Sequence, residues 1–364
     1  MLDALAGIVD QWTDARSHVP FKCVVFARSD ELAQDVRRFF GGRELMFIEV
    51  LFQPPAFGSD LIVWLWSVSG ETVTGSRLGN VLRVAQEELE WYSITCNEAA
   101  ETANGKGDSN VSREIAQEFS NAWSVIRNST GSACACDAEV VRTWIFVPDI
   151  NGAIDGRSTY QELNRARREA FALDYPECNH ATRQVKYPAS TGIGTCGEKL
   201  HLSALACRRS GAVTIRSIEN PRQQSAFAYS SDVSPVVPLF SRAVLVSGEM
   251  DALLVVSGTA SIAGEHSVHP QSASRQARKS LENIASLVEC ALGGAAVRPL
   301  HSLRQCSVYI RNLEHAAEVR QVCRELLEPE TAVVYVAGDI CRPELLVEIE
   351  AIAMFPREAA ARRS

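Results

Sequence analysis

The chain lacks a long apolar run and a basic leader, and each absence removes a class of protein. No stretch of about 20 apolar residues occurs that could span a bilayer. The first ten residues, Met1–Asp10, carry acids and lack the basic start and long apolar stretch of a secretory signal. The 11 cysteines are an odd number and follow no disulfide framework. We therefore expect reduced thiols, a cytoplasmic location and no membrane partner.

Basic residues are in deficit, with 36 Lys and Arg against 44 Asp and Glu, so the formal net charge is -8. Binding to a phosphate backbone needs an excess of basic residues. The balance therefore argues against a nucleic-acid partner. It leaves room for a small anion held by a few local arginines.

Cofactor and metal motifs are also missing. There is no Walker loop and no G-x-S-x-G elbow, and Gly192-Ile-Gly194 lacks the third glycine of a dinucleotide site. Cys134 and Cys136 have no second pair at zinc spacing and are more simply free thiols. His266 and His269 lie three residues apart, and we interpret them as loop or cap residues. No metal or organic cofactor is expected.

The 364 residues suffice for about two domains, and 46% hydrophobic content allows a sizeable core. In the N-terminal part, short β-forming runs alternate with helical apolar spacing. Predicted strands are Phe21–Ala27, Leu45–Phe52, Asp60–Val68, Val141–Val147, Val213–Ser217 and Gln224–Tyr229. Predicted helices are Leu78–Tyr92, Val111–Arg127 and Ser158–Phe171, and predicted loops are Glu101–Asn110 and Tyr175–Gly197.

The C-terminal part has the clearer pattern. Strands are predicted at Ala243–Val246, Leu253–Val256, Cys306–Arg311, Ala332–Ala337 and Leu345–Ala353. Helices are predicted at Gln271–Leu292 and Leu313–Leu327. The order β-β-α-β-α-β is typical of an α+β domain with helices on one face of a mixed sheet. Ser230–Pro238 is interpreted as the connection between domains, so we expect domains at 1–235 and 236–364.

This C-terminal domain resembles the RidA (YjgF) fold. The resemblance rests on Val256-Ser-Gly-Thr-Ala260 and on the last strand, Val347-Glu-Ile-Glu-Ala-Ile-Ala353. Imine-hydrolysing members of that fold carry an arginine shortly after a proline before the penultimate strand. Here Pro329 is followed by Glu-Thr-Ala332, which argues against a simple imine deaminase.

Seven further motifs, in order along the chain, resemble the chorismatase family over roughly residues 140 to 355. They are Arg142-Thr-Trp-Ile-Phe-Val-Pro-Asp-Ile-Asn151, Tyr160-Gln-Glu-Leu-Asn-Arg-Ala-Arg167, Tyr187-Pro-Ala-Ser-Thr-Gly-Ile-Gly194, Asn220-Pro-Arg-Gln-Gln-Ser-Ala226, Phe240-Ser-Arg-Ala243, Ser257-Gly-Thr-Ala-Ser-Ile262, and Gly338-Asp-Ile-Cys-Arg342 leading to Glu348. The chain departs from the family at Ile145, where Asn is usual, and at Gly264-Glu-His266, where Gly-His is usual.

The resemblance implies an enzyme that binds chorismate and removes its enolpyruvyl group. A protonated glutamic acid would deliver the proton, and Glu348 is the candidate; the alternation of the strand places it on the face opposite Val347 and Ile349. Without the resemblance, a lone strand glutamate would more simply be exposed. Arg167 and Arg242 are the candidate carboxylate clamps, although a surface arginine is often only solvated.

Other candidate substrate-binding residues are Tyr160, Tyr229, Gly258, Thr259 and Arg342. Tyr160 and Arg167 are seven residues apart, so they share one helix face. Arg142, Arg222 and Arg311 are held in reserve.

Cys341 and Gly258 bear on the product. Both match the family branch that forms 3-hydroxybenzoate, in which the neighbouring ring hydroxyl displaces pyruvate and Cys341 guides the rearrangement. A free cysteine is otherwise most often a buried small hydrophobe. The hydrolytic branch, which forms 3,4-dihydroxycyclohexa-1,5-diene carboxylate and pyruvate, stays an alternative, as do some 4-hydroxybenzoate and a non-catalytic module that binds an aromatic acid.

The resemblance also implies the architecture. We expect two RidA/YjgF-like (chorismate mutase-like) α+β domains, the first degenerate, with the active-site cleft between them. Tyr160, Arg167 and Tyr229 would then come from one half, and Glu348 and Cys341 from the other. The protein is expected to be a monomer or a small homo-oligomer.

Overall fold

The structure is a computed structural model. It describes residues 7, 18–41, 48–70, 72–86, 89–96, 111–130, 138–154, 156–175, 186–208, 211, 213–249, 251–294 and 298–356. The predicted loop at 101–110, the pair Cys134 and Cys136, residues 45–47 of the second predicted strand and residues 176–185 of the second predicted loop lie outside these ranges.

A three-stranded sheet comes first in the chain, in the order β2-β1-β3. Its strands are β1 (His18–Ala27), β2 (Ile48–Phe52) and β3 (Leu61–Ser69). Helix α2 (Asp30–Phe40) joins β1 to its parallel neighbour β2. Ser29 caps α2 by accepting a hydrogen bond from the backbone N–H of Leu32 (3.2 Å), and the helix buries Ala33, Val36 and Phe40.

A seven-stranded mixed sheet follows, in the order β19-β10-β7-β11-β6-β5-β4. Its strands are β4 (Thr74–Leu78), β5 (Val81–Gln86), β6 (Leu89–Cys96), β7 (Ala138–Pro148), β10 (Ala189–Thr195), β11 (His201–Arg208) and β19 (Asp339–Ile340). Helices α3 (Val111–Thr130) and α4 (Thr159–Asp174) pack together on its outer face, where Phe119, Trp123, Leu163 and Phe171 are buried.

A six-stranded mixed sheet completes the fold, in the order β12-β13-β14-β20-β17-β18. Its strands are β12 (Thr214–Ile218), β13 (Ala243–Ser247), β14 (Asp251–Ala260), β17 (Leu303–Ile310), β18 (Ala332–Ala337) and β20 (Val347–Pro356). Helices α5 (Ala273–Ala291) and α6 (Ala316–Leu326) cover one face. The shorter elements are β8 (Ala153–Ile154), β9 (Arg157–Ser158), β15 (Ile262–Ala263), β16 (His266–Ser267), and the 3-10 turns Ala226–Ala228, Pro299–Ser302 and Leu313–His315.

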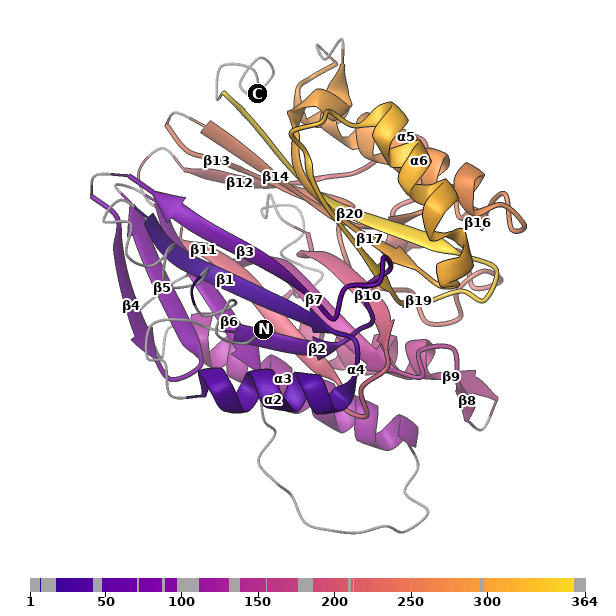
Figure 1. Cartoon of the computed structure of the whole chain (residues 1–364), viewed down its shortest axis with the longest axis horizontal. Helices are drawn as coiled ribbons and strands as arrows, with labels where there is room; N and C mark the ends of the chain where they lie inside the picture. Colours follow the sequence, from indigo (N-terminus) through magenta and orange to yellow (C-terminus); the bar gives the residue numbers. More distant parts are fainter. Residues whose placement is uncertain are drawn as a thin grey trace.

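The three sheets turn their helix-free faces toward one another. Side chains from all three meet in one apolar cluster, which includes Trp64 of β3, Trp144 of β7 and Val255 of β14. The helices lie outside, with α5 and α6 on one side of the molecule and α2, α3 and α4 on the other (Figure 1). Strand alternation produces this arrangement, since Trp144 faces the centre while Ile145 faces the helices.

The sheets repeat one topology. In the second sheet β5-β6-α3-β7-α4-β10-β11 follow one another, and in the third β13-β14-α5-β17-α6-β18-β20 do. The pairings match: β7 with β10 and β17 with β18 are parallel, whereas β11 and β20 pair antiparallel with both neighbours. The first sheet has the last three strands and one helix of this unit, with β1 and β2 parallel and β3 antiparallel.

Three predicted elements are wrong. Leu78–Tyr92 is not a helix but contains the antiparallel strands β5 and β6, because Leu82 and Val84 alternate into the central cluster. The predicted strand Gln224–Tyr229 contains a 3-10 turn instead. The predicted loop Tyr175–Gly197 contains β10, whose small residues Ser190-Thr-Gly192 gave no strand signal.

The other predicted helices and strands are confirmed within a few residues, and so are the α+β class and the mixed sheets. A boundary at 235 would cut through both large sheets. Strand β12 precedes it but pairs in the six-stranded sheet, and β19 follows it but pairs in the seven-stranded sheet. The division into 1–235 and 236–364 stays a prediction.

Candidate functional site

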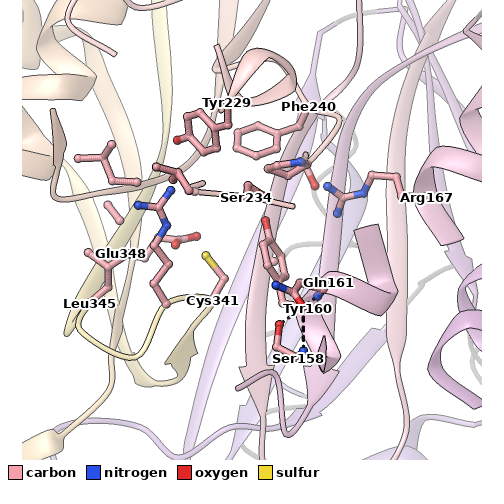
Figure 2. A pocket seen from close by; sticks show the side chains of 18 of the residues that line it. Ser158, Tyr160, Gln161, Arg167, Tyr229, Ser234, Phe240, Cys341, Leu345 and Glu348 are labelled. Atoms are coloured by element: carbon pink, nitrogen blue, oxygen red, sulfur yellow. Dashed lines mark hydrogen bonds between the residues drawn. The ribbon is translucent and has the colours of Figure 1, made fainter. Parts of the chain in front are cut away.

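A cavity of about 130 Å3 lies where the second and third sheets meet. Side chains from α4 and β10 line it on one side, and side chains from β14, β20 and the segment after β19 line it on the other (Figure 2). Eight of the nine predicted site residues line this cavity, all from one chain: Tyr160, Arg167, Tyr229, Arg242, Gly258, Cys341, Arg342 and Glu348.

Glu348 lies on β20 with its side chain on the inner face of the sheet. Val347 and Ile349 point to α5 and α6, so the alternation of the strand turns Glu348 and Glu350 inward. Glu348 is 5% exposed. Its burial, and then the negative charge of Glu350, raise the pKa of the Glu348 carboxyl to about 8 against the charges of Arg142 and Arg242. The carboxyl is therefore protonated at neutral pH.

Gly258 leaves the space that the carboxyl of Glu348 occupies. The pairing of β14 with β20 has a bulge between Val256 and Thr259. A Cβ at Gly258 would lie 2.0 Å from Oε1 and 2.9 Å from Cδ of Glu348. Any other residue at this position requires the carboxyl to move.

Arg167 projects from α4, in the face of the cavity opposite Glu348 (Figure 2). The helix is anchored by a capping box, in which Ser158 accepts from the backbone of Gln161 (3.2 Å) and the Gln161 side chain accepts from the backbone of Ser158 (3.1 Å). Arg167 is 2% exposed, its pKa is lowered by burial, and its Nη1 has no hydrogen-bond partner among the described residues. A buried cation with a spare donor is suited to an anionic ligand.

Arg242 and Arg342 both lie next to Tyr229. Arg242 Nη2 donates to Tyr229 Oη (2.6 Å) and to the carbonyl of Gln224 (2.8 Å), while its Nε has no partner in the described part of the chain. Arg342 Nη1 donates to the carbonyl of Glu265 (2.9 Å), and its guanidinium lies 5.4 Å from the Tyr229 ring centre. With Arg167, the cavity has three guanidinium groups.

Cys341 faces the cavity beside Tyr160, with which its side chain forms a hydrogen bond. Burial, and then the negative charge that Glu348 carries once it has lost its proton, raise the pKa of the Cys341 thiol to about 12. Burial also raises the pKa of Tyr160. Both side chains are therefore neutral at neutral pH and act as hydrogen-bonding groups rather than nucleophilic anions.

Thr259, the ninth predicted residue, does not line the cavity. Its hydroxyl donates to the carbonyl of Ser257 (2.8 Å), and the residue is buried where β14 pairs with β20. Of the reserve arginines, Arg142 lies behind the cavity, Arg311 holds the segment after β19, and Arg222 is exposed. Eleven further lining residues had been given no role. Of these, Gln161, Ser190, Gly192, Phe240, Ala260 and Ile262 lie within the quoted motifs, and Ser158, Val233, Ser234, Pro238 and Leu345 lie outside them.

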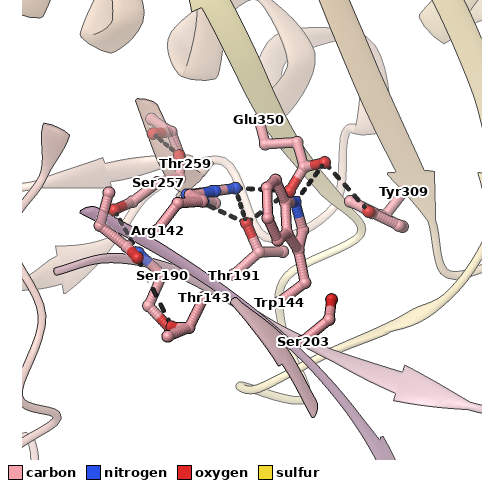
Figure 3. Close-up of polar contacts among 12 residues, drawn as sticks. Arg142, Thr143, Trp144, Ser190, Thr191, Ser203, Ser257, Thr259, Tyr309 and Glu350 are labelled. Atoms are coloured by element: carbon pink, nitrogen blue, oxygen red, sulfur yellow. Dashed lines mark hydrogen bonds and ion pairs between the residues drawn. The ribbon is translucent and has the colours of Figure 1, made fainter. Parts of the chain in front are cut away.

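Glu350, two residues after Glu348 on β20, is the centre of a buried polar network (Figure 3). The Glu350 carboxylate accepts from Arg142 Nη2 (2.6 Å), Thr191 Oγ1 (2.6 Å), Trp144 Nε1 (3.3 Å) and Tyr309 Oη (3.3 Å). Thr191 Oγ1 also accepts from Arg142 and from the backbone N–H of Gly258 (3.0 Å). The sequence indicated that Glu350 shares a face with Glu348, but the motifs gave it no role.

No group of three or more His, Cys, Asp or Glu side chains able to hold a metal occurs within the described ranges. None of the described helices combines the length and apolar character needed to cross a bilayer.

The fold and the cavity together define a class of site. Three guanidinium groups face one buried, protonated carboxyl at the junction of two α+β units, which suits a small molecule with more than one carboxylate that accepts a proton.

Comparisons with known proteins agree with this class. Residues 65–206 match the family model described as "Chorismatase FkbO/Hyg5-like, N-terminal", and residues 234–355 match "Endoribonuclease L-PSP", the model of RidA/YjgF proteins. A 3-hydroxybenzoate synthase of Streptomyces hygroscopicus is 38% identical over 60% of this chain and 64% of its own length. A chorismatase of Streptomyces rapamycinicus is 36% identical over 58% of this chain and 63% of its own length.

A crystal structure of a chorismatase matches in fold, with a TM-score of 0.69 and 21% identity over 93% of this chain and 94% of that one. The chain thus combines an N-terminal region that matches the N-terminal domain of chorismatases with a C-terminal region that matches the RidA/YjgF type. The matched stretch spans less than two thirds of the length of each of these curated relatives.

Proposed function

We propose that the protein is a chorismatase that converts chorismate into 3-hydroxybenzoate and pyruvate. The observation that carries the proposal is that the buried carboxyl of Glu348 lines the same cavity as Arg167, Arg242 and Arg342. Chorismate has two carboxylates and an enol ether, so it needs cationic groups to bind and an acid to react.

The arginines hold the substrate. Arg167 lies across the cavity from Glu348, and Arg242 and Arg342 lie next to Tyr229. Nη1 of Arg167 and Nε of Arg242 have no protein acceptor among the described residues, so each is free to donate to a carboxylate oxygen. Two separate cationic positions fit the two carboxylates of the substrate.

Glu348 supplies the proton. It transfers its proton to the methylene carbon of the enolpyruvyl group, which leaves an oxocarbenium ion on the ether carbon. The oxygen of the neighbouring ring hydroxyl then attacks the ring carbon that carries the ether. This forms an arene oxide and releases pyruvate with the ether oxygen, and the hydroxyl proton returns to Glu348. One C–O bond of the arene oxide then breaks, the carbon that keeps the oxygen loses its proton, and the oxygen gains one, which gives 3-hydroxybenzoate. The step needs no external oxidant, reductant or added water.

Gly258 and Cys341 support this product rather than the hydrolytic one. Gly258 brings the carboxyl of Glu348 into contact with β14, leaving no gap between that carboxyl and the strand backbone. Cys341 remains a neutral thiol beside Tyr160 and can guide the opening of the arene oxide as a weak hydrogen-bonding group.

We also infer that the N-terminal part is a second, degenerate RidA-like unit. The repeated strand order and pairing of the second and third sheets support this. One chain then forms the inter-unit cleft by itself, with Tyr160 and Arg167 from one unit and Glu348 and Cys341 from the other.

The test is incubation of the purified protein with chorismate and no added cofactor, followed by separation of the products and measurement of pyruvate. Pyruvate and 3-hydroxybenzoate in equal amounts are expected. Pyruvate with the cyclohexadiene diol would replace the proposed product by the hydrolytic one. Absence of pyruvate would overturn the enzyme proposal in favour of a module that binds an aromatic acid.

Glu348→Gln is the decisive variant, because glutamine keeps the shape and cannot donate the proton. We expect at least about a 100-fold loss of turnover, with chorismate still binding in equilibrium dialysis. Glu330→Gln is the matched control, since Glu330 is exposed and does not line the cavity. It should keep full turnover.

A further inference from the structure

The Glu350 carboxylate is fixed directly behind the candidate acid. Glu350 is 5% exposed and lies two residues after Glu348, on the same face of β20. Successive residues on one face of a strand are about 7 Å apart. Its four donors come from three other strands: Arg142 and Trp144 on β7, Thr191 on β10 and Tyr309 on β17. Such a network leaves the carboxylate one orientation.

Thr191 connects this network to the other wall of the acid's position. Its hydroxyl donates to Glu350 (2.6 Å) and accepts from the backbone N–H of Gly258 (3.0 Å), the residue against which Glu348 lies. The same hydroxyl therefore sets Glu350 and the β14 bulge relative to each other. The proton-donating mechanism proposed above assigns no task to any member of this network.

We propose that Glu350 is a positioning residue whose fixed negative charge, held in place by Arg142 and Thr191, keeps Glu348 in its protonated, proton-donating form. The proposal rests on the proposed function for its purpose. Its physical content, the protonation state of Glu348 in the substrate-free protein, can be measured without chorismate.

The charges around Glu348 show why Glu350 matters. Burial is the largest cause of the raised pKa of Glu348, and Glu350 is the next. Arg142 and Arg242 act in the opposite direction. The titratable and charged groups that face Glu348 are Glu350 on β20, Arg142 on β7, Tyr309 on β17, Arg242 before β13, Tyr160 and Arg167 on α4, and Cys341 and Arg342 after β19.

Removing the charge of Glu350 therefore lowers the pKa of Glu348. Two charges about 7 Å apart at an effective dielectric constant near 20 interact strongly enough to change the acid dissociation constant of Glu348 by about 10- to 100-fold. In Glu350→Gln, Arg142 also loses its counter-charge, which acts in the same direction. Glu350→Asp keeps the negative charge and shortens the side chain by one methylene group, so the pKa of Glu348 should stay close to its wild-type value.

The experiment is an infrared titration of the carboxyl C=O stretch of the full-length protein without substrate, with the Glu348→Gln spectrum subtracted to isolate Glu348. In the wild type, Glu348 should lose its proton near pH 8. In Glu350→Gln this should occur about one to two pH units lower, and in Glu350→Asp close to the wild-type value. Tyr309→Phe removes a longer hydrogen bond to Glu350 (3.3 Å) from a neutral donor and keeps the Glu350 charge, so Glu348 in this control should lose its proton near the wild-type pH.

A Glu350→Gln protein in which Glu348 titrates at the wild-type pH would overturn the proposal. So would a Glu350→Asp protein displaced as far as Glu350→Gln, since that would indicate a role of shape rather than charge. Neither result depends on turnover, so a failure of the proposed chorismatase activity would be seen separately, in the product assay.

Discussion

A single missing methyl group at Gly258 leaves room for the carboxyl of Glu348. The Cβ that any other residue would bring lies 2.0 Å from Oε1 of Glu348, too close for both to stay. Because the obstructing atom is the end of a flexible side chain, the strand pairing itself can persist. At this position the constraint acts on the carboxyl of Glu348 rather than on the fold.

The Gly258→Ala protein should therefore fold normally, but the carboxyl of Glu348 should be displaced from its wild-type position. We expect a change of melting temperature below about 4 °C, equivalent to under about 1 kcal/mol, together with a fall in turnover of about tenfold or more and a larger share of diol among the products. Gly197→Ala is the control, since its Cβ would meet only the Thr195 side chain, at an ordinary 3.5 Å. An unchanged product ratio and rate in Gly258→Ala would contradict the role given to the glycine.

The residues that line the cavity were largely predictable, and those that support them were not. Glu348 and Cys341 fall within motifs, and strand alternation indicated the face of Glu348. Two of the four donors to Glu350 are Arg142 and Thr191, which lie 208 and 159 residues away in sequence. Periodicity in one segment carries no information on which distant side chain completes a buried hydrogen bond.

The segment between β19 and β20, residues 341–346, contains Cys341, the residue to which the proposed function gives control of the product. It carries Cys341 and Arg342 into the cavity without regular structure of its own. Arg311 donates to the carbonyls of Leu345 (2.8 Å), Ile340 (2.7 Å) and Arg342 (2.9 Å). The segment is thus ordered by side chains of its neighbours.

Two further side chains hold the same segment. Asn151 donates to the carbonyl of Ile340 (2.9 Å), and Gln276 donates to the carbonyl of Glu344 (3.0 Å) and accepts from the backbone of Leu346 (2.7 Å). Asn151 lies in the N-terminal half and Gln276 on α5, so both halves of the chain fix the position of Cys341.

Arg311→Met should loosen this segment while leaving the rest of the domain intact. Three carbonyls lose a charged donor, so we expect a loss of about 2–4 kcal/mol in the free energy of unfolding. Hydrogen exchange followed by mass spectrometry should show faster exchange in 340–346 and unchanged exchange in α5. Arg320→Met is the control, since Arg320 on α6 packs on the Phe57 ring instead. Equal exchange in 340–346 of the two variants would contradict the assigned role.

Elements with one clear period were predicted, and elements with an ambiguous period were not. The spacing of apolar residues in α5 and α6 allows only a helix, and both were found. In Leu78–Tyr92, the apolar positions satisfy both a helical and an alternating pattern. The segment forms strands because β6 pairs with β11, a contact that the local pattern does not contain. β10 was not predicted because its small residues have no β-forming pattern of their own. It is a strand because it pairs with β7 and β19, which lie far away in the sequence.

At the scale of the molecule, the fold brings three related sheets around one apolar centre. The cavity lies at the junction of the second and third sheets. The junction of the first and second sheets is closed by polar side chains instead. Lys22 of β1 forms an ion pair with Glu49 of β2, both 1% exposed, and donates to Ser203 Oγ of β11 (3.1 Å).

Glu49 is the centre of this closed junction. It also accepts from Thr95 Oγ1 of β6 (3.3 Å) and lies 3.0 Å from His201 Nε2 of β11. Lys22 in turn lies 4.3 Å from the centre of a Trp144 ring, next to the network behind the candidate acid. The cluster therefore ties the small N-terminal sheet to the strand that carries Arg142.

Glu49→Gln should be among the most destabilising single changes in the described chain, because it leaves Lys22 buried without its counter-charge. We expect a loss of about 3–5 kcal/mol in the free energy of unfolding by denaturant titration at pH 7, against little change for Glu198→Gln, which is exposed. Lys22→Met combined with Glu49→Gln should cost less than Glu49→Gln alone, since no charge is then left unpaired. If the double variant were as unstable as the sum of the single ones, the two residues would act independently.

The pH dependence supplies an independent check on the same pair. Burial raises the pKa of Glu49, but Lys22 and the hydrogen bond from His201 outweigh it and hold the pKa at about 2, below the usual 4.5. An acid with a lowered folded-state pKa contributes stability that is fully present above the unfolded value and is lost as the pH falls through the folded one. The difference in unfolding free energy between the wild type and Glu49→Gln should thus be constant above about pH 5 and shrink between 4.5 and about 2. A difference that stays constant down to pH 2 would mean that the charge of Glu49 does not stabilise the junction between the sheets.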